Sequence, residues 1–236
     1  MFLEAAALAR REHAAVVLRL TTHVCHAKQW VDFGPLPDAE ADWTPRFDPA
    51  QGPYVPVAAT VFPLKRRALG QLEGFAAYAE QSGANRVLAP HGADGKLGLV
   101  ASGLPALAAL ECLEAAGQAV DLFQLGMSHP LPRGKLSDFL RSHEQVLVIE
   151  ELDRVLEMDL KTLAYDEVIG SRILARDQAE DLQGEWGPAR VSGLLARFFP
   201  QRFEAPAASQ ASAEALPPRL PQMCPGCGHR SAYHAI

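Results

Sequence analysis

The feature that most constrains the fold is a run of residues 98–151, in which short apolar stretches alternate with helix-period segments. Each apolar stretch stops at a glycine, at a serine–glycine pair or at two glutamates. Strand, helix, strand, helix and strand joined by short loops is typical of a parallel sheet covered by helices. Because the apolar stretches are continuous and do not alternate with polar residues, they are typical of strands buried on both faces. The sequence therefore predicts an α/β domain with a parallel or mostly parallel sheet and helices on both faces. The expected strands are residues 97–101, 120–125 and 146–149, with helices at 105–116 and 132–142 between them.

Composition excludes several classes of protein. The chain has 236 residues, of which 48% are hydrophobic and 21% charged, as is ordinary for a globular protein. Its net charge of −6 argues against a nucleic-acid or anionic-membrane binder. No apolar run approaches the roughly 20 residues that span a bilayer, and the charged N-terminus does not fit a secretory signal. Four cysteines without a disulfide-framework spacing fit a reducing compartment, so we expect a cytoplasmic protein.

The N-terminal part contains a first candidate site. Residues 1–13 have the pattern of an amphipathic helix, and residues 15–22 that of a buried strand running into His23, Cys25 and His26. Open α/β sheets place their sites at the carboxyl ends of strands, so His26 is a candidate to face a substrate or cofactor. An ordinary hydrogen-bonded loop histidine is the alternative. A metal site is disfavoured, because in a strand Cys25 shares a face with His23 while His26 points away.

The rest of the sequence predicts two helices and the segments that connect them. Residues 34–63 hold seven prolines and predict a surface connector, residues 64–82 return to helix spacing, and residues 85–95 read as a loop. A further helix is expected around residues 191–198, and the Ala-, Pro- and Ser-rich residues 200–222 predict a linker.

Two features of the central run resemble catalytic motifs. Ser102 and Gly103 lie between a strand and a helix, where backbone amides can receive an anion, but the three glycines of a dinucleotide fingerprint are absent. A tight turn explains them equally. Glu150, Glu151 and Asp153 follow the third strand, and the dipole at the start of a helix is sufficient to account for them.

The sharpest motif is Cys224-Pro225-Gly226-Cys227. A Cys-x-x-Cys turn aims both sulfurs inward, as in iron–sulfur clusters, zinc ribbons and redox dithiols. A cluster or a structural zinc needs about four ligands, so Cys224 and Cys227 are metal-ligand candidates with an incomplete set. A small zinc protein that adds His229 or His234 remains an alternative.

Five segments resemble, in collinear order, the large (alpha) subunit of the indolepyruvate ferredoxin oxidoreductases, in the 2-oxoacid:ferredoxin oxidoreductase superfamily. LRLTTHVCHAKQWV resembles the end of the pyrimidine-binding domain, with His23 in place of the usual arginine. GLVASGLP, DLFQLGMSHPLP and VLVIEELD resemble the transketolase C-terminal-like domain. LPPRLPQMCPGCGHRSAYHAI resembles the start of the thiamine-diphosphate-binding domain, although Gly228 stands where the large subunit more often has proline.

The resemblance implies an internal fragment, because the family's activating glutamate and magnesium motif have no counterpart here. The implied parts are the remnant of the pyrimidine-binding α/β domain (1–34), a Pro-rich connector and helix (35–85), the transketolase C-terminal-like domain (86–200), the linker (201–222) and the start of the thiamine-diphosphate-binding domain (223–236).

The implied activity is oxidative decarboxylation of an indolepyruvate-type arylpyruvate to the acyl-CoA. The complete enzyme would use thiamine diphosphate, magnesium and 4Fe-4S clusters, with His26 and His229 as candidate cofactor-binding residues. Its partners would be the remaining domains of the subunit, a small (gamma/beta-type) subunit, ferredoxin or a similar acceptor, and CoA, in an oligomer without nucleic acid or membrane. We expect the fragment alone to bind no cofactor and to be inactive. The alternatives are a related pyruvate, 2-oxoglutarate or branched-chain oxidoreductase subunit, and a non-catalytic α/β dimerisation module.

Overall fold

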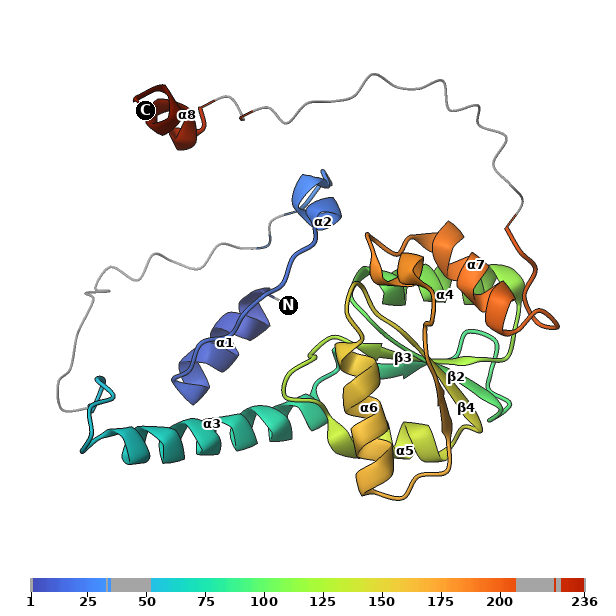
Figure 1. The fold of residues 1–236 in the computed structure, drawn as a ribbon, viewed down its shortest axis with the longest axis horizontal. Coiled ribbons are helices and arrows are strands. Elements are labelled where there is room, and N and C mark those ends of the chain that lie inside the picture. The colour runs from blue at the N-terminus through green and yellow to red at the C-terminus, as the bar shows by residue number, and fades with distance from the viewer. Residues whose placement is uncertain (1, 33, 35–51, 207–222, 224–225, 236) are drawn as a thin grey trace. The chain divides into compact units, whose positions relative to one another are not determined.

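The computed structural model describes residues 2–32, 34, 52–206, 223 and 226–235. The chain forms two compact units, Met1–Ala205 and Pro206–Ile236 (Figure 1). None of the helices within the described residues has the length and apolar content needed to cross a bilayer.

A five-stranded sheet forms the centre of the first unit, in the order β1-β3-β2-β4-β5. Strand β2 pairs in parallel with β3 and β4, and β4 pairs in parallel with β5. Strand β1 lies antiparallel to β3 at one edge. The prediction of a mostly parallel sheet is confirmed. The strands are β1 (Asn85–Leu88), β2 (Leu97–Ser102), β3 (Asp121–Leu125), β4 (Gln145–Ile149) and β5 (Arg172–Leu174).

Helices cover both faces of this sheet, as predicted (Figure 1). The residues of β2 alternate between two cores: Leu99 packs with α4 and α7 on one face, and Val100 packs with α5 and α6 on the other. Because both faces are covered, β2 and β4 are buried almost throughout, which explains their uninterrupted apolar sequences. The covering helices are α4 (Leu104–Ala116), α5 (Arg133–Arg141), α6 (Val155–Asp166) and α7 (Pro188–Phe198).

The loop expected over residues 85–95 is a partly wrong prediction, because it contains β1. Strand β1 is short and only its first residue is fully buried, so its sequence carries no strand pattern. Tertiary hydrogen bonds hold it instead. Asn85 Oδ1 accepts from the amides of Gly126 and Met127, at 3.0 and 2.9 Å, and its Nδ2 donates to Ala79 O at 2.9 Å.

The strand expected over residues 15–22 is also wrong. Residues 15–21 have no regular secondary structure, and α2 (Thr22–His26) is a short helix. Val17 and Leu20 are 87% and 59% exposed. A strand needs a neighbour for its backbone N–H and C=O groups, and no described strand pairs with this segment.

The two remaining helices of this unit agree with the sequence. Helix α1 (Phe2–Glu12) packs against α3 (Val61–Gln81), which begins three residues before its predicted start and has Pro63 in its first turn, where proline is tolerated. Gln71 Nε2 on α3 donates to the carbonyls of Glu12 and His13, at 3.0 and 3.1 Å, and so caps the end of α1. A 3₁₀ helix, η2 (Ala179–Leu182), precedes α7.

The second unit contains α8 (Gly228–Ala235) directly after Cys227. Most of the predicted connector (residues 35–51) and of the predicted linker (residues 207–222), together with Cys224, lies outside the described residues.

The close packing of β2 against α5 leads to a stability prediction. A Cβ added at Gly98 would lie 2.8 Å from Cζ of Phe139 and 3.0 Å from Cγ of His143. Both side chains are buried, so we expect Gly98→Ala to lower the free energy of unfolding by about 1–3 kcal/mol in urea denaturation. Gly83→Ala is the control, because nothing lies within 4 Å of its added Cβ, and equal effects of the two substitutions would contradict this packing.

Candidate functional site

The direction of the connections switches between the neighbouring strands β2 and β4. From β2 the chain crosses through α4 to β3 on one side, whereas from β4 it crosses through α6 to β5 on the other. Open α/β sheets bind ligands at such a switch in strand order. The residues that follow β2 and β4 are therefore the candidates to line a site.

The turn after β2 favours the structural explanation of the Ser102-Gly103 pair. Gly103 has φ +65° and ψ −138°, a conformation essentially restricted to glycine. Of the first three residues of α4, Pro105 has no amide hydrogen, and the amide of Ala106 already donates to Gly103 O at 3.2 Å. Few amides remain to receive an anion at this helix end.

Glu150, directly after β4, caps helix α6. Its carboxylate accepts hydrogen bonds from the amides of Leu156 and Glu157, at 2.8 and 3.0 Å. Burial raises the pKa of Glu150, while these two hydrogen bonds and the charge of Arg176 act in the opposite direction. The sequence-based explanation, that the start of a helix accounts for the acidic residues, is confirmed for Glu150.

Arg176 is the residue of this region that the sequence analysis missed. Its side chain is completely buried. One terminal nitrogen donates to the carbonyls of Glu150 and Asp181, at 2.5 and 2.8 Å, and the other donates to Leu152 O at 3.2 Å. Burial lowers the pKa of Arg176, and the charge of Glu150 is the largest effect that opposes this. The hydrogen bonds of the guanidinium thus connect the loop after β4 to the loop after β5. In the sequence, the only sign of this role is a charged residue soon after a short apolar stretch.

Arg19 links the N-terminal segment to the same edge of the sheet. Its guanidinium lies 3.8 Å from Oε2 of Glu151, whose other carboxylate oxygen is buried without a hydrogen-bond partner among the described residues. This contact brings the side chain of Arg19 close to the carboxyl end of β4, although residues 15–21 form no strand there.

The predicted site residues belong to two separate units of the chain. His26 is exposed at the end of α2, and Cys25 beside it is exposed as well, so the strand geometry assumed for them does not apply. His229 and Cys227 belong to the second unit. Among the described residues, no three His, Cys, Asp or Glu side chains are grouped as a metal site would require.

Cys227 and His229 do form a local pair. Gly226, with φ +79°, makes the turn before them, and Cys227 Sγ lies 3.3 Å from Nδ1 of His229 at the start of α8. A thiol and an imidazole are ligand types that suit zinc, and a thiol suits an iron–sulfur cluster. Cys224, the other predicted ligand, lies outside the described residues.

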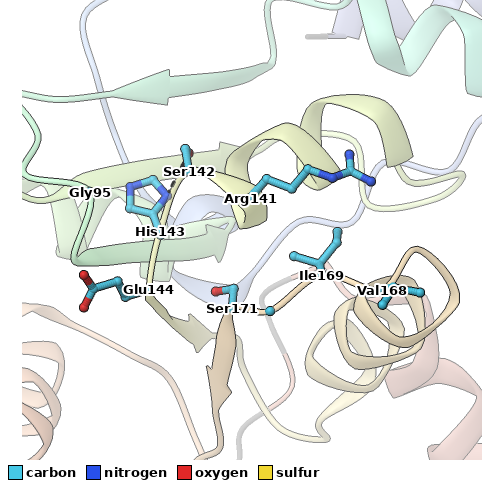
Figure 2. A pocket seen from close by; sticks show the side chains of 9 residues that line it. Gly95, Arg141, Ser142, His143, Glu144, Val168, Ile169 and Ser171 are labelled. Carbon is cyan, nitrogen blue, oxygen red and sulfur yellow. Dashed lines mark hydrogen bonds between the residues drawn. The ribbon is translucent and has the colours of Figure 1, made fainter.

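A pocket of about 440 Å³ lies at the opposite, amino edge of the sheet (Figure 2). Gly95, Glu144 and Ser171, which precede β2, β4 and β5, contribute to its lining. His143 also lines the pocket, and both of its ring nitrogens have partners: one lies 2.8 Å from Phe139 O and the other lies 3.1 Å from Asp121 Oδ2. These contacts fix the start of β3 and the end of α5, so we assign them a structural role.

Fold and connections define a doubly wound α/β domain whose carboxyl edge is held by a buried arginine and a capping glutamate. No protein-family model matches the chain. Curated relatives do, and they bear the name indolepyruvate oxidoreductase subunit IorA. The relative from Methanothermobacter thermautotrophicus is 31% identical over 231 residues, and those from Pyrococcus abyssi and Thermococcus kodakarensis are 31% identical over 230 and 233 residues.

The chain is a homologue of part of IorA, which confirms the resemblance seen in the sequence. Each of these matches covers 94% of this chain but 35% of the relative, so the chain spans about a third of the length of the curated relatives it matches. Among solved structures, a chain described as a split gene transketolase, inactive beta4 tetramer, is 23% identical over 49% of this chain and 40% of its own, with a TM-score of 0.35. That similarity is too distant to carry an argument.

Proposed function

We propose that this chain forms a central part of the large subunit of a 2-oxoacid:ferredoxin oxidoreductase that acts on indolepyruvate or a similar arylpyruvate. The complete enzyme would decarboxylate the 2-oxoacid oxidatively, form the acyl-CoA and pass electrons through iron–sulfur clusters to ferredoxin. The observation that carries the proposal is collinear similarity to IorA subunits over 94% of the chain. The α/β fold supports it, because the family-like segments at residues 98–105, 121–132 and 146–153 coincide with β2, β3, β4 and the loops that follow them.

The same proposal assigns the parts of the chain. Residues 86–200 would be the transketolase C-terminal-like domain, residues 1–34 the end of the pyrimidine-binding domain and residues 223–236 the start of the thiamine-diphosphate-binding domain, joined by residues 35–85 and 201–222. Val17 and Leu20 are 87% and 59% exposed, and the other domains of the subunit would cover them.

Thiamine diphosphate, when bound, supplies the nucleophilic carbon and the electron sink for decarboxylation. Among the described residues, no three His, Cys, Asp or Glu side chains are grouped in a way that could hold its magnesium. We therefore assign no step of the reaction to them. Those ligands would come from the parts of the subunit to which this chain has no counterpart.

Four residues of this chain are proposed to contact the cofactors of the complete enzyme. His26, exposed after the segment that Arg19 ties to the carboxyl edge of the sheet, and His229 would line the coenzyme site. Cys224 and Cys227 would ligate a 4Fe-4S cluster with two further thiolates. Cys227 Sγ lies 3.3 Å from Nδ1 of His229, so the two proposed sites would adjoin each other.

A chimeric enzyme tests the function directly. The matching segment of IorA from Methanothermobacter thermautotrophicus is replaced by this chain, and the chimera is produced with its small subunit. With CoA and indolepyruvate we expect it to reduce a viologen dye, whereas a chimera that lacks the segment should be inactive. Reduction with pyruvate or 2-oxoglutarate in place of indolepyruvate would assign the chain to a related oxidoreductase.

Two further outcomes are informative. A correctly assembled chimera that reduces the dye with none of these acids would contradict the proposal. Cys224→Ser with Cys227→Ser is expected to lower the iron content per large subunit, whereas an unchanged iron content would reject the cluster assignment. Cys112→Ser is the matched control, since Cys112 is packed against the α4–α7 core.

A further inference from the structure

Helix α6 carries an apolar stripe on the side that faces away from its own sheet. Leu156, Leu160 and Leu163 point into the core. On the opposite side, Val155 is 65% exposed, Met158 58% and Tyr165 86%. Thr162 continues the stripe, and its hydroxyl is used within the helix because it donates to Met158 O at 3.0 Å.

The spacing of this stripe is that of a coiled-coil seam. Val155, Met158, Thr162 and Tyr165 follow one another at intervals of three, four and three residues, which places them at alternating a and d positions of two heptads. A solvent-facing helix has no need of this pattern, and apolar residues in a row on an exposed face are typical of an interaction surface.

The charged residues beside the stripe are sorted by sign. On one flank, Lys161 occupies a g position, and Arg154, the N-cap residue directly before α6, stands at the g position of the first heptad; Asp159 and Asp166 occupy the e positions on the other flank. In a parallel pair of identical helices, each g residue meets the e residue five positions later on the partner. Arg154 would then meet Asp159 and Lys161 would meet Asp166. In an antiparallel pair like flanks meet, so acid would face acid and base would face base.

We propose that the outer face of α6 is a homodimer interface, in which two copies of this chain pack their α6 helices in parallel about a two-fold axis. Burial of the apolar stripe between the two helices stabilises the dimer. The flanking charges favour the parallel arrangement over the antiparallel one. Three of the four flanking charges also have contacts within the chain. Arg154 donates to Arg176 O at 3.3 Å and lies 3.8 Å from the carboxylate of Glu157. Lys161 uses one of its three donors on the buried Glu157 at 2.6 Å, and Asp166 lies 3.4 Å from the exposed Arg133.

The oligomeric state of the full chain tests the interface. We expect a concentration-dependent dimer by light scattering and sedimentation, and Met158→Glu should raise the dimer dissociation constant on the order of a hundredfold, because it places charge in the centre of the seam. Leu107→Glu is the matched control: Leu107 is 56% exposed on the outer side of α4, and its substitution should leave the constant unchanged. A chain that is monomeric at all concentrations, or a dimer that Met158→Glu does not weaken, overturns the proposal.

The orientation has its own tests. In a parallel pair Met158 faces its own copy, so Met158→Cys should form an interchain disulfide on oxidation, which Leu107→Cys should not. Asp159→Lys and Arg154→Glu should each weaken the dimer, and the double substitution should restore it. If the double variant is weaker than both single variants, the helices do not pair in parallel. None of these measurements depends on enzymatic activity, so their outcome is separate from that of the chimera.

Discussion

Arg176→Met is expected to lower the free energy of unfolding by about 3–5 kcal/mol, which is the usual cost of removing one partner of a buried ion pair. The substitution fills most of the volume but removes the donors to the carbonyls of Glu150, Leu152 and Asp181. It also leaves the buried carboxylate of Glu150, 3.7 Å from the guanidinium, without its cation. Urea denaturation followed by circular dichroism measures the loss.

The loss should depend on pH in a defined direction. Burial raises the pKa of Glu150 above 4.5, so its protonated form favours the folded state and that contribution disappears as the pH rises through the folded pKa. In Arg176→Met the pKa of Glu150 in the folded state rises further. The stabilising contribution of protonated Glu150 is therefore lost over a wider pH range. The difference in stability between wild type and Arg176→Met should therefore be smallest near the unfolded pKa of Glu150 and should grow toward neutral pH.

Two substitutions control this prediction. Arg172→Met removes an exposed arginine from β5 and should change stability by less than about 0.5 kcal/mol. Arg176→Lys keeps the positive charge but cannot reach three carbonyls with one planar group, so its cost should be intermediate. If Arg176→Met were no more costly than Arg172→Met, the network would contribute nothing to stability.

Trp186→Ala is expected to cost about 3–5 kcal/mol, as for other buried tryptophans. Trp186 is 1% exposed and packs in the core formed by β2, β4, α4 and α7, although it lies in the turn before α7. The guanidinium of Arg190 also lies 4.2 Å from the centre of its ring system. The alanine variant would leave a large cavity between the turn and the sheet.

Trp186→Phe separates packing from hydrogen bonding. The indole nitrogen is buried without a partner among the described residues, so phenylalanine loses volume but no hydrogen bond, and its cost should be well below that of alanine. Trp30→Ala is the matched control, because Trp30 is fully exposed and its loss should leave the unfolding midpoint unchanged. Equal costs for the phenylalanine and alanine variants would show that the ring is not held by packing.

The central strands were predictable because each is buried on both faces. Residues 97–101 and 146–149 must be apolar at every position to satisfy the two cores, so the sequence alone identified them as β2 and β4. Helices α4 and α5 were found for a similar reason, since each follows such a strand at a turn. The resemblance to IorA also came from local motifs, and the comparison with known relatives confirmed it.

The prediction of a strand over residues 15–22 was wrong because it used the same criterion, an apolar sequence taken as a sign of burial. Residues 15–22 have the composition of a buried strand, but burial depends on neighbours, and the described residues provide no strand to pair with them. Edge strand β1 was missed for the opposite reason, because Asn85 and its three hydrogen bonds hold the strand where its own sequence does not.

The candidate site divides in the same way. Sequence alone determined the residue types that chemistry could use, including His26, Cys224, Cys227 and His229, since their spacing is local. Only the tertiary structure decided that Arg176 closes the carboxyl edge of the sheet, because its partners Glu150 and Leu152 lie more than twenty residues away along the chain. Hydrophobic periodicity acts over a few residues and can be read from a sequence, whereas the pairing of a buried charge depends on which segments the folded sheet brings together.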